Sequence, residues 1–550
     1  MRRTAGIANH PASGNTTDLN SSHRTVALLL PHRIPSRHPH GGAVLTSSCT
    51  PPAIGVALML GLGAFMLLVA AAVRSMVKNT HDFVIADRRI GFGFGVGSVI
   101  AVWTWSMAVM MSSAQAYSFG VSGLIWFVVP NGLAVMVMVP FALRLRRQMP
   151  AGYTIVEFIR ERFQNKPATT VMLVAMLLGL LAEIFINLFG VVLVMGVIFN
   201  LNPTVVLILT LATVTVYSYF GGLWTSAITA TFNTLLITVP SAIVVLYVLA
   251  RVGGPEFVFQ QVDRAGPNTL NAFDGAAAAG FGISLALGLL ASTMADQTFW
   301  QKAWALKPAT MGRTFVWAGL WFYPIPIVLG LLGLVGLGLG VSTDDLGNAG
   351  PGGIGPYVVS HLGLPIVLVA LYVLIILNAC YSSIDGAFAA LSSVVAVDVL
   401  KRAKPGIAPK TLFRYTKASI LVAGVIGGIV VSSGIDYVEL VTTVFFLKAA
   451  LIIPLGLAIF WRRMTSTAFV ASLLLAIAVG YPVRQAFGEL PGIVTLELVS
   501  LVVAVGISLL QNQTFDYSML RKRTEVLSEG PVLTRTAQEP VAAAKAEAVR

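Results

Sequence analysis

Charged residues are scarce in this chain of 550 residues. Asp, Glu, Lys and Arg together make up 11% of the sequence, whereas hydrophobic residues make up 56%. Soluble domains contain about 25% charged residues, so the composition excludes an ordinary water-soluble protein. Apolar runs of about 20 residues, the length of a membrane-spanning helix, recur along the chain. The alternation of apolar and polar residues that a transmembrane barrel needs is missing, so the spans are expected to be helical.

Residues that carry out enzyme chemistry are also few. The chain has two cysteines, and because Cys49 precedes the first apolar run while Cys380 lies inside a later one, we expect no disulfide. The sequence has no H-E-x-x-H motif and no nucleophile elbow, and its Gly-rich stretches lack the spacing of nucleotide-binding loops. We therefore expect neither enzyme activity nor a cofactor. The net charge of +13 comes from basic clusters between apolar runs, which is typical of membrane-protein loops rather than of nucleic-acid binding.

The chain divides into three parts. Residues 1–51 are rich in Arg, Ser, His and Pro and are expected to form a disordered tail, and residues 511–550 a second disordered tail on the cytoplasmic side. Residues 52–510 are predicted to form an all-α domain of about thirteen transmembrane helices. The predicted spans are 53–73, 92–117, 121–143, 168–199, 203–220, 222–250, 276–296, 314–340, 362–397, 412–431, 438–460, 465–482 and 491–510.

The basic residues of the loops predict an orientation in the cell membrane. Loops on one side carry 21 Lys and Arg residues, whereas the opposite loops carry only Arg251, Arg264 and Arg484. The positive-inside tendency places the first set in the cytoplasm, with the N-terminus outside and the C-terminus inside. The N-terminal tail disagrees, because it holds five Arg residues. Either this tail crosses despite its charge or the true start codon lies downstream, and we favour the second interpretation.

One amphipathic segment lies outside the spans. Residues 154–163 have apolar side chains on one face and charges at Glu157, Arg160, Glu161 and Arg162, so we expect a short helix at the membrane surface. It is interpreted mainly as a connector, with a role in gating as the alternative.

Polar groups are sparse in the spans and concentrate in three places. The ninth predicted span contains Asn378 to Asp385, the second contains Ala101 to Ser106, and the seventh is interrupted by Gly280-Phe-Gly282. Hydroxyls and freed carbonyls could bind a cation, although the serines could instead bond to their own helix. The second and seventh spans are five apart. Two interrupted helices at this spacing are typical of inverted-repeat transporters.

Several of these stretches resemble the sodium:solute symporter family over residues 82–465. They are Asp82 to Gly91, Tyr219 to Leu223, Asp296 to Gln301, and the ninth span with its Ser-Ser pair ahead of Asp398. The resemblance implies a LeuT-like inverted-repeat core of five plus five helices, and weakly the urea-transporter branch. It also implies a sodium ion bound between the second and ninth spans. The implied ligands are the carbonyls of Ala101, Thr104 and Ala379 and the hydroxyls of Ser382 and Ser383.

The expected function is sodium-coupled import of a small polar organic solute such as urea, a short carboxylate or an amino acid. The solute is expected near mid-membrane, and the candidate lining residues are Trp103, Trp105, Ser106, Phe185 and Phe281. These aromatic residues could equally be ordinary packing. A proton-coupled symporter of the same fold is the alternative, and a membrane-embedded sensor or a channel is the alternative from another class. The partners are lipid and solute, and the oligomeric state is left open.

Three charged residues lie deep in apolar sequence. They are Asp385, Lys448 and Glu183. Because an isolated charge in the bilayer costs several kcal/mol, at least one pairing is expected. One interpretation is a structural ion pair between Asp385 and Lys448. The other is that Asp385, which is outside the family pattern, responds to the coupling ion. The family's usual aspartate is replaced here by Ala230.

Overall fold

A computed structural model describes residues 50–431, 437–521 and 526–527 of the chain. The described part is helical, and its one isolated β-bridge joins Ile90 to Leu306. The helices of the first half, in order, are α1 (Pro52–Val73), η1 (Arg74–Met76), α2 (Thr80–Ile85), η2 (Ala86–Arg88), α3 (Phe92–Trp103), α4 (Ser106–Gln148), α5 (Ile155–Phe163), α6 (Lys166–Phe199), α7 (Pro203–Arg251) and α8 (Pro255–Ala265).

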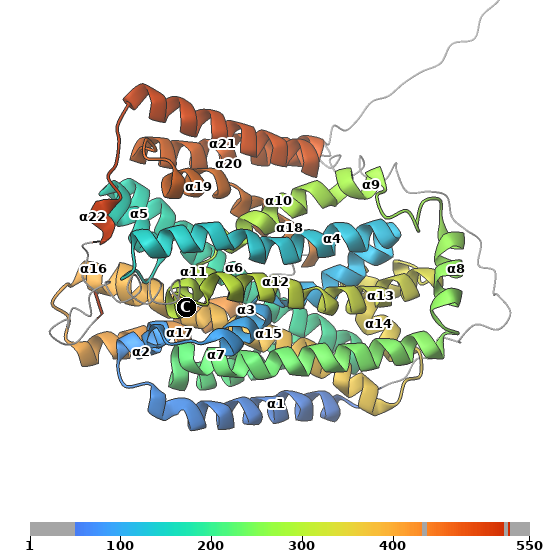
Figure 1. The fold of residues 1–550 in the computed structure, drawn as a ribbon. Coiled ribbons are helices and arrows are strands. Elements are labelled where there is room, and N and C mark those ends of the chain that lie inside the picture. The colour runs from blue at the N-terminus through green and yellow to red at the C-terminus, as the bar shows by residue number, and fades with distance from the viewer. Residues whose placement is uncertain (1–49, 432–436, 522–525, 528–550) are drawn as a thin grey trace, which may run out of the picture. The chain divides into compact units, whose positions relative to one another are not determined.

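The helices of the second half continue from a short helical turn to the last described helix (Figure 1). They are α9 (Gly275–Ala277), η3 (Ala278–Gly282), α10 (Ile283–Met294), α11 (Gln297–Ala305), α12 (Met311–Phe322), α13 (Pro324–Gly338), η4 (Asp344–Gly353), α14 (Ile354–His361), α15 (Ile366–Val394), η5 (Val395–Leu400), α16 (Lys401–Ala403), α17 (Pro409–Val431), α18 (Tyr437–Ala449), α19 (Ile452–Phe460), α20 (Ser466–Phe487), α21 (Glu489–Gln511) and α22 (Ser518–Arg521).

Eleven helical segments in the described ranges are long and apolar enough to cross a membrane. Two of them, α4 and α7, are each two helices that meet at a glycine with a positive φ: Gly120 at +63° and Gly222 at +52°. A side chain would not fit there, because a Cβ would lie 2.1 Å from the Thr269 carbonyl oxygen at Gly120 and 2.5 Å from that of Phe83 at Gly222. With both divided, the helical segments correspond one to one with the predicted spans.

The second predicted span is interrupted where we expected. Helix α3 ends at Trp103, Thr104 and Trp105 have non-helical backbone angles, and α4 begins at Ser106. The seventh span differs from its prediction. Gly280 and Gly282 belong to a π-helical turn that continues directly into α10, and the chain leaves the helix later, at Ala295 and Asp296, before α11. The predicted site of interruption was therefore wrong by about four helical turns. Glycine adds flexibility, but here the backbone stays helical, and Asp296 ends the interruption by capping α11.

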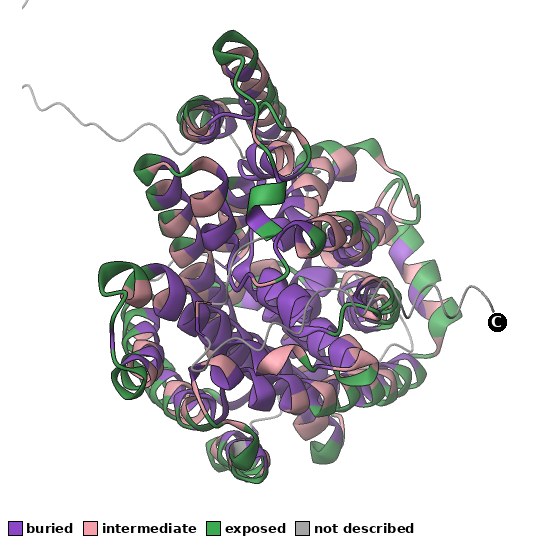
Figure 2. Ribbon diagram, turned by 60° about the vertical axis from the view of Figure 1, so that its left-hand side comes forward, coloured by how far each residue is buried: buried purple, intermediate pink, exposed green. Residues whose placement is uncertain are grey.

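Helix α15 lies at the centre of the bundle. Of the apolar 18-residue stretch that could cross the membrane in the segment Ile366–Ala403, 72% is buried. The corresponding share is 28% in α21 and 33% in α1. Its neighbours include α3, α6, α7, α11 and α17. Figure 2 shows the same gradient, with buried residues in the middle and exposed residues on the outer helices. The polar residues of α15 therefore face protein rather than lipid.

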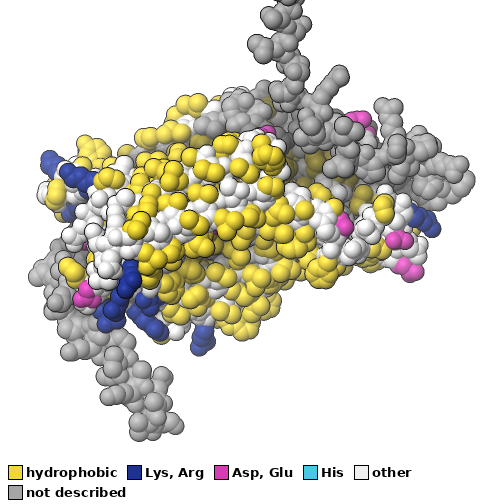
Figure 3. Space-filling view, turned by 90° about the horizontal axis from the view of Figure 1, so that it is seen from above, with side chains coloured by type: hydrophobic (Ala, Val, Ile, Leu, Met, Phe, Trp, Pro, Cys, Tyr) yellow, Lys and Arg dark blue, Asp and Glu magenta, His cyan; other side chains and the backbone are white. Residues whose placement is uncertain are grey.

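The loops that we expected to share one side of the membrane do lie together at one end of the helices. The Arg521 Nε atom donates to the Arg147 carbonyl (3.1 Å), Arg162 donates to the Arg462 carbonyl (3.1 Å), and Arg88 donates to the Gly152 carbonyl (2.9 Å). On the face in Figure 3, Lys and Arg side chains gather mainly at this end, and a hydrophobic band separates it from the other. These contacts confirm that the loops share a side, and the assignment of that side to the cytoplasm stays a prediction.

The predicted tails fall mostly outside the described residues. Residues 1–49, including Cys49, are among them, as are residues 528–550. The chain after α21 nevertheless remains packed on the bundle for some distance. The Tyr517 hydroxyl donates to the Ala458 carbonyl (2.7 Å), and α22 follows. The packed domain thus extends beyond the predicted boundary at residue 510.

Candidate functional site

The end of α3 and the middle of α15 bring three oxygen atoms together. The hydroxyl of Ser382 lies 3.0 Å from the Ala101 carbonyl oxygen and 3.1 Å from that of Ala379. Because α3 ends two residues after Ala101, the Ala101 carbonyl lacks its usual N–H donor one turn later, whereas the Ile100 carbonyl keeps the Thr104 N–H. One hydroxyl carries a single proton. Three oxygens with one proton among them can therefore act as ligands for a cation.

The hydroxyls of the two other predicted sodium ligands, Ser383 and Thr104, bond to other carbonyls of α3. Ser383 directs its hydroxyl to the Val102 carbonyl at 3.4 Å, which keeps it at the same helix end. Thr104 donates its hydroxyl to the Ile100 carbonyl at 2.7 Å. The predicted ligand of Thr104 is its backbone carbonyl, which this bond does not involve, so its role stays a prediction. Of the five residues, the structure thus brings Ala101, Ala379 and Ser382 into direct contact, with Ser383 beside them.

The predicted solute-lining residues at the α3–α4 break are all buried. Trp103 donates from its indole nitrogen to the Asn131 carbonyl (3.0 Å), which is a packing role. Trp105 is 1% exposed, and its indole nitrogen has no hydrogen-bond partner among the described residues. The Ser106 N–H donates to the Asn187 side-chain oxygen (2.9 Å), and the Ser106 hydroxyl lies 2.8 Å from that of Tyr437. Trp105 and Ser106 thus remain the best-placed candidates of this set.

The two phenylalanines of the prediction lie elsewhere. Phe185, on α6, is half-buried and packs near Gly427 of α17. It is not brought to the break by any described contact. Phe281 packs against Phe119 with the rings tilted (centroids 5.2 Å apart) and lines a small cavity whose wall includes Phe445. The ring of Phe445 also contacts Trp105, with centroids 5.8 Å apart. Phe281 is therefore connected to the break through one intervening ring.

Lys448 forms its ion pair with Asp296, and not with Asp385 as one of our interpretations had it. The ammonium of Lys448 is 3.4 Å from an Asp296 carboxylate oxygen and 3.3 Å from the Ser292 hydroxyl. It also lies over the Trp105 ring, 4.8 Å from the centroid. The predicted Asp385–Lys448 pair is wrong, because α18 meets the α10–α11 break rather than the middle of α15.

Asp385 has a neutral partner instead. The hydroxyl of Ser218 on α7 donates to its carboxylate. One turn earlier on α15, the carbonyl of Tyr381 accepts the hydroxyl of Tyr217 (2.9 Å). Asp385 is 1% exposed, so it is a buried carboxylate at the contact of α7 with α15. Its suggested response to the coupling ion stays a prediction.

Glu183 lies in the same cluster as Asp296. It is fully buried on α6, and one of its carboxyl oxygens, Oε2, is 3.3 Å from the Thr298 hydroxyl. The other oxygen, Oε1, has no donor among the described residues. Asp296 accepts the Thr298 N–H (2.8 Å) and the Thr298 hydroxyl (2.6 Å) as the cap of α11. Glu183, Asp296 and Lys448 thus form one buried charged group around the second interrupted helix.

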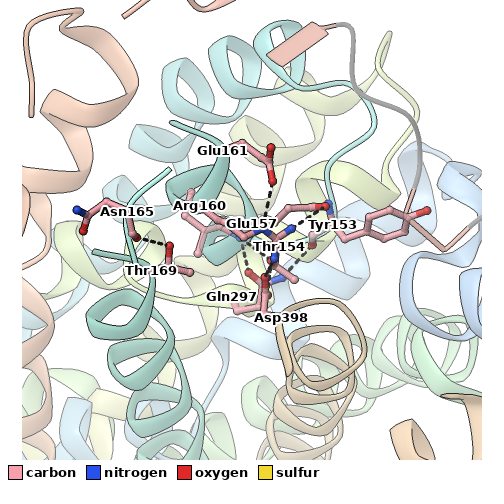
Figure 4. Close-up of polar contacts among 10 residues, drawn as sticks. Tyr153, Thr154, Glu157, Arg160, Glu161, Asn165, Thr169, Gln297 and Asp398 are labelled. Atoms are coloured by element: carbon pink, nitrogen blue, oxygen red, sulfur yellow. Dashed lines mark hydrogen bonds and ion pairs between the residues drawn. The ribbon is translucent and has the colours of Figure 1, made fainter. Parts of the chain in front are cut away.

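A second polar network joins α5 to the end of α15 (Figure 4). Thr154, the cap of α5, donates to Asp398 (2.6 Å), and Arg160 also bonds Asp398 (3.2 Å). Gln297, at the start of α11, accepts the Ile155 N–H (3.0 Å). The helix α5 was predicted correctly, but much of it is buried in protein, so it is more than a surface connector. We call Thr154, Arg160, Gln297 and Asp398 the α5 clamp.

The last residues of α5 are held by the far end of the chain. The Arg162 guanidinium donates to the Met464 carbonyl (3.0 Å) and lies over the Phe515 ring, 4.2 Å from its centroid. Burial lowers the pKa of Arg162, and the nearby Tyr517 partly offsets this effect. The clamp and this contact fix α5 from both sides.

Comparison with known proteins identifies the architecture around these sites. The model of the sodium:solute symporter family matches residues 83–475. The chain belongs to the sodium:solute symporter family. It is therefore a multi-pass membrane protein of a transporter family and not an enzyme, as predicted.

Several curated relatives of this chain carry urea in their names. It is 25% identical over 403 residues to the probable urea active transporter 1 of Schizosaccharomyces pombe, which covers 68% of this chain and 59% of that protein. It is 23% identical over 482 residues to the urea-proton symporter DUR3 of Oryza sativa subsp. japonica, which covers 78% of this chain and 65% of that protein. The chain thus spans about 60% of the length of these relatives.

Solved structures show the fold. A Na+-coupled sialic acid symporter in a substrate-bound outward-open state superposes with a TM-score of 0.69 at 19% identity, over 84% of this chain and 99% of that one. Mhp1, a nucleobase-cation-symport-1 family transporter in a closed conformation, gives a TM-score of 0.50 at 15% identity, over 81% of this chain and 96% of that one. The chain accordingly has the LeuT-like inverted-repeat fold that the resemblance implied.

Sequence reasoning missed several residues of the charged group. Asp296 was noted only as part of a family motif, and Thr298 and Ser292 were not singled out. A usable signal was present: Asp296 stands at the end of an apolar run, directly before a more polar stretch, and Asp is a preferred residue at the N-terminus of a helix. An interrupted helix with a capped second half could have been placed at Asp296 on that basis.

Proposed function

We propose that the symporter couples sodium to the import of a small polar organic solute, with urea as the leading candidate. The main support for this proposal is that the Ser382 hydroxyl lies within 3.1 Å of both the Ala101 and the Ala379 carbonyl oxygen. Carbonyls at an interrupted helix are ligands that sodium uses in transporters of this architecture. Their position between α3 and α15 also favours coupling, because α3 is half of an interrupted helix.

The solute is proposed to lie at the α3–α4 break, beside Trp105 and Ser106. The polar groups gathered there are the Ser106 and Tyr437 hydroxyls and the Asn187 amide. Urea offers two amino groups and one carbonyl, which such donors and acceptors can match, and an indole face could cover its plane. The names of the curated relatives support the same solute. A short carboxylate or an amino acid remains within the proposal.

Proton coupling is the second candidate. It is favoured by the buried group of Glu183, Asp296 and Lys448, which holds two carboxyls but one ammonium. One relative is named a urea-proton symporter, which supports the same alternative. The two ions need not exclude each other, because the charged group uses none of the five proposed sodium ligands.

The decisive experiment is uptake by the purified protein in proteoliposomes. Radiolabelled urea, short monocarboxylates, proline and pantothenate would be tested with an inward sodium gradient, an inward proton gradient, both, or neither. We expect urea uptake that the sodium gradient drives. Urea accumulation under the proton gradient alone, unchanged by sodium, would select the second candidate. Uptake of another solute but not of urea would redirect the solute assignment without touching the coupling ion.

A further inference from the structure

The Glu183 group contains more negative than positive groups. Glu183 is 0% exposed, Asp296 3% and Lys448 5%. Lys448 pairs with Asp296 at 3.4 Å. If both carboxyls were ionised, one negative charge would remain without a cation in contact with it, because the other buried ammonium nearby, that of Lys302, bonds the Ser98 hydroxyl instead. That arrangement is costly enough that a group usually takes up a proton instead.

The hydrogen bonds of the Thr298 hydroxyl also indicate that Glu183 carries a proton. Its hydroxyl lies 2.6 Å from an Asp296 oxygen and 3.3 Å from a Glu183 oxygen. A hydroxyl donates one hydrogen bond only. If Thr298 donates to Asp296, the closer oxygen, the contact with Glu183 is a hydrogen bond only when Glu183 itself carries a proton.

The second Glu183 oxygen completes the argument. Oε1 is buried and has no donor among the described residues. The Asp296 carboxyl shares the Thr298 hydroxyl with Glu183, and it cannot donate a hydrogen bond when ionised. A carboxylic acid carries one proton, which it can either donate from Oε2 to the Thr298 hydroxyl or hold on Oε1, and in either position the proton removes the unpaired negative charge. Paired carboxyls that share one proton are the known outcome when two such groups meet.

We propose that Glu183 and Asp296 together form a proton-binding site that holds one proton in this conformation, with Glu183 as its carrier. The site lies on α6 and on the interrupted α10–α11 helix, and α18 supplies Lys448. When the interrupted helix moves during the transport cycle, the contact of Asp296 with Lys448 and that of Thr298 with Glu183 change, because these partners lie on other helices. Asp296 and Glu183 would then compete differently for the proton, so the site can bind it on one side and release it on the other.

The ionisable groups around Glu183 are few in the described part of the chain. Asp296 and Lys448 interact with it directly, and Lys302 on α11 interacts with Glu183, Asp296 and Asp385. Lys302 donates to the Ser98 hydroxyl on α3 at 2.6 Å. Lys302 thus links the proton site to α3 and to the α7–α15 contact.

Infrared spectroscopy of the purified full-length protein in lipid tests protonation without any solute. We expect the wild type to show the carbonyl stretch of a buried carboxylic acid near neutral pH. This band should be lost in Glu183→Gln and also in Asp296→Asn, because removing either carboxyl lets the other ionise beside Lys448. The matched control is Glu497→Gln on α21, another acid whose carboxyl oxygens have no partner among the described residues; it should remove at most its own band and leave the Glu183 band in place. An unchanged band in both Glu183→Gln and Asp296→Asn would overturn the proposal.

Transport gives the second readout, and only this part rests on the proposed function. Solute added outside wild-type proteoliposomes should acidify the lumen, followed with a trapped pH dye. Glu183→Gln keeps the shape and hydrogen bonding of a neutral acid, so it should retain solute counterflow but lose acidification. Glu183→Gln that acidifies the lumen like the wild type overturns the proton site. If the wild type transports no urea, the proposed function fails, whereas the infrared measurement still tests the proton site independently.

Discussion

Lys448 on α18 forms an ion pair with Asp296, the cap of α11, and its ammonium also covers the face of Trp105. This one contact joins the residue that ends the second interruption to the aromatic residue of the first. The two breaks of the inverted repeat are therefore coupled through a charged side chain from a third helix. A movement of Asp296 at one break would therefore shift Lys448 against Trp105 at the other.

Lys448→Met should destabilise the protein, because it leaves Asp296 as a buried carboxylate without its cation. Removal of one partner from a buried pair costs about 3–5 kcal/mol. The double variant Lys448→Met with Asp296→Asn removes both charges and should recover most of this loss. Thermal unfolding in detergent, read by tryptophan fluorescence, measures it. The control is Lys448→Met with Asp385→Asn, for which we expect no recovery. Recovery in that control would restore the pair that the sequence suggested.

Replacing both Ser382 and Ser383 by Ala should weaken sodium binding. It removes two hydroxyl oxygens from the proposed site, and a contact of this strength is worth about 1 kcal/mol. We expect the sodium concentration for half-maximal uptake to rise roughly 10- to 100-fold, with little change in protein level. Ser392→Ala is the matched control, because that hydroxyl bonds to the Ala389 carbonyl of its own helix. Wild-type sodium dependence in the double variant would remove these serines from the site.

Asp398→Asn should loosen α5. The aspartate accepts from Thr154 and Arg160, and loss of a charged hydrogen-bond partner costs about 1.5–3 kcal/mol. Hydrogen exchange of residues 155–163, followed by mass spectrometry, should accelerate by roughly 10- to 100-fold. Asp345→Asn is the control, since this exposed carboxylate bonds Ser342 in a loop. Equal exchange of α5 in wild type and Asp398→Asn would show that the clamp does not hold the helix.

Labelling of single cysteines decides the orientation. In a background with Cys49 and Cys380 replaced by Ser, Lys404→Cys should react with an impermeant maleimide only after cells are opened. Asp263→Cys, on α8 at the other end of the helices, should react in intact cells. Both positions are exposed, so access to the protein surface is equal. Labelling of Lys404→Cys from outside would reverse the orientation.

The sequence by itself determined the spans and one of the two interrupted helices. Hydrophobic runs long enough to cross a bilayer are a local property, so thirteen segments could be placed without the fold. The break at Thr104 was also visible, since polar and aromatic residues stand there inside an apolar helix. Family motifs then supplied the inverted repeat.

The tertiary structure alone decided which buried charges meet. Asp385 and Lys448 were paired because both are charged residues in apolar sequence, yet Asp385 bonds Ser218 and Lys448 bonds Asp296. Hydropathy and periodicity say which residues are buried but not which helices are neighbours. Contacts between residues more than 100 positions apart depend on how helices pack, and only that packing brings Glu183, Asp296 and Lys448 together.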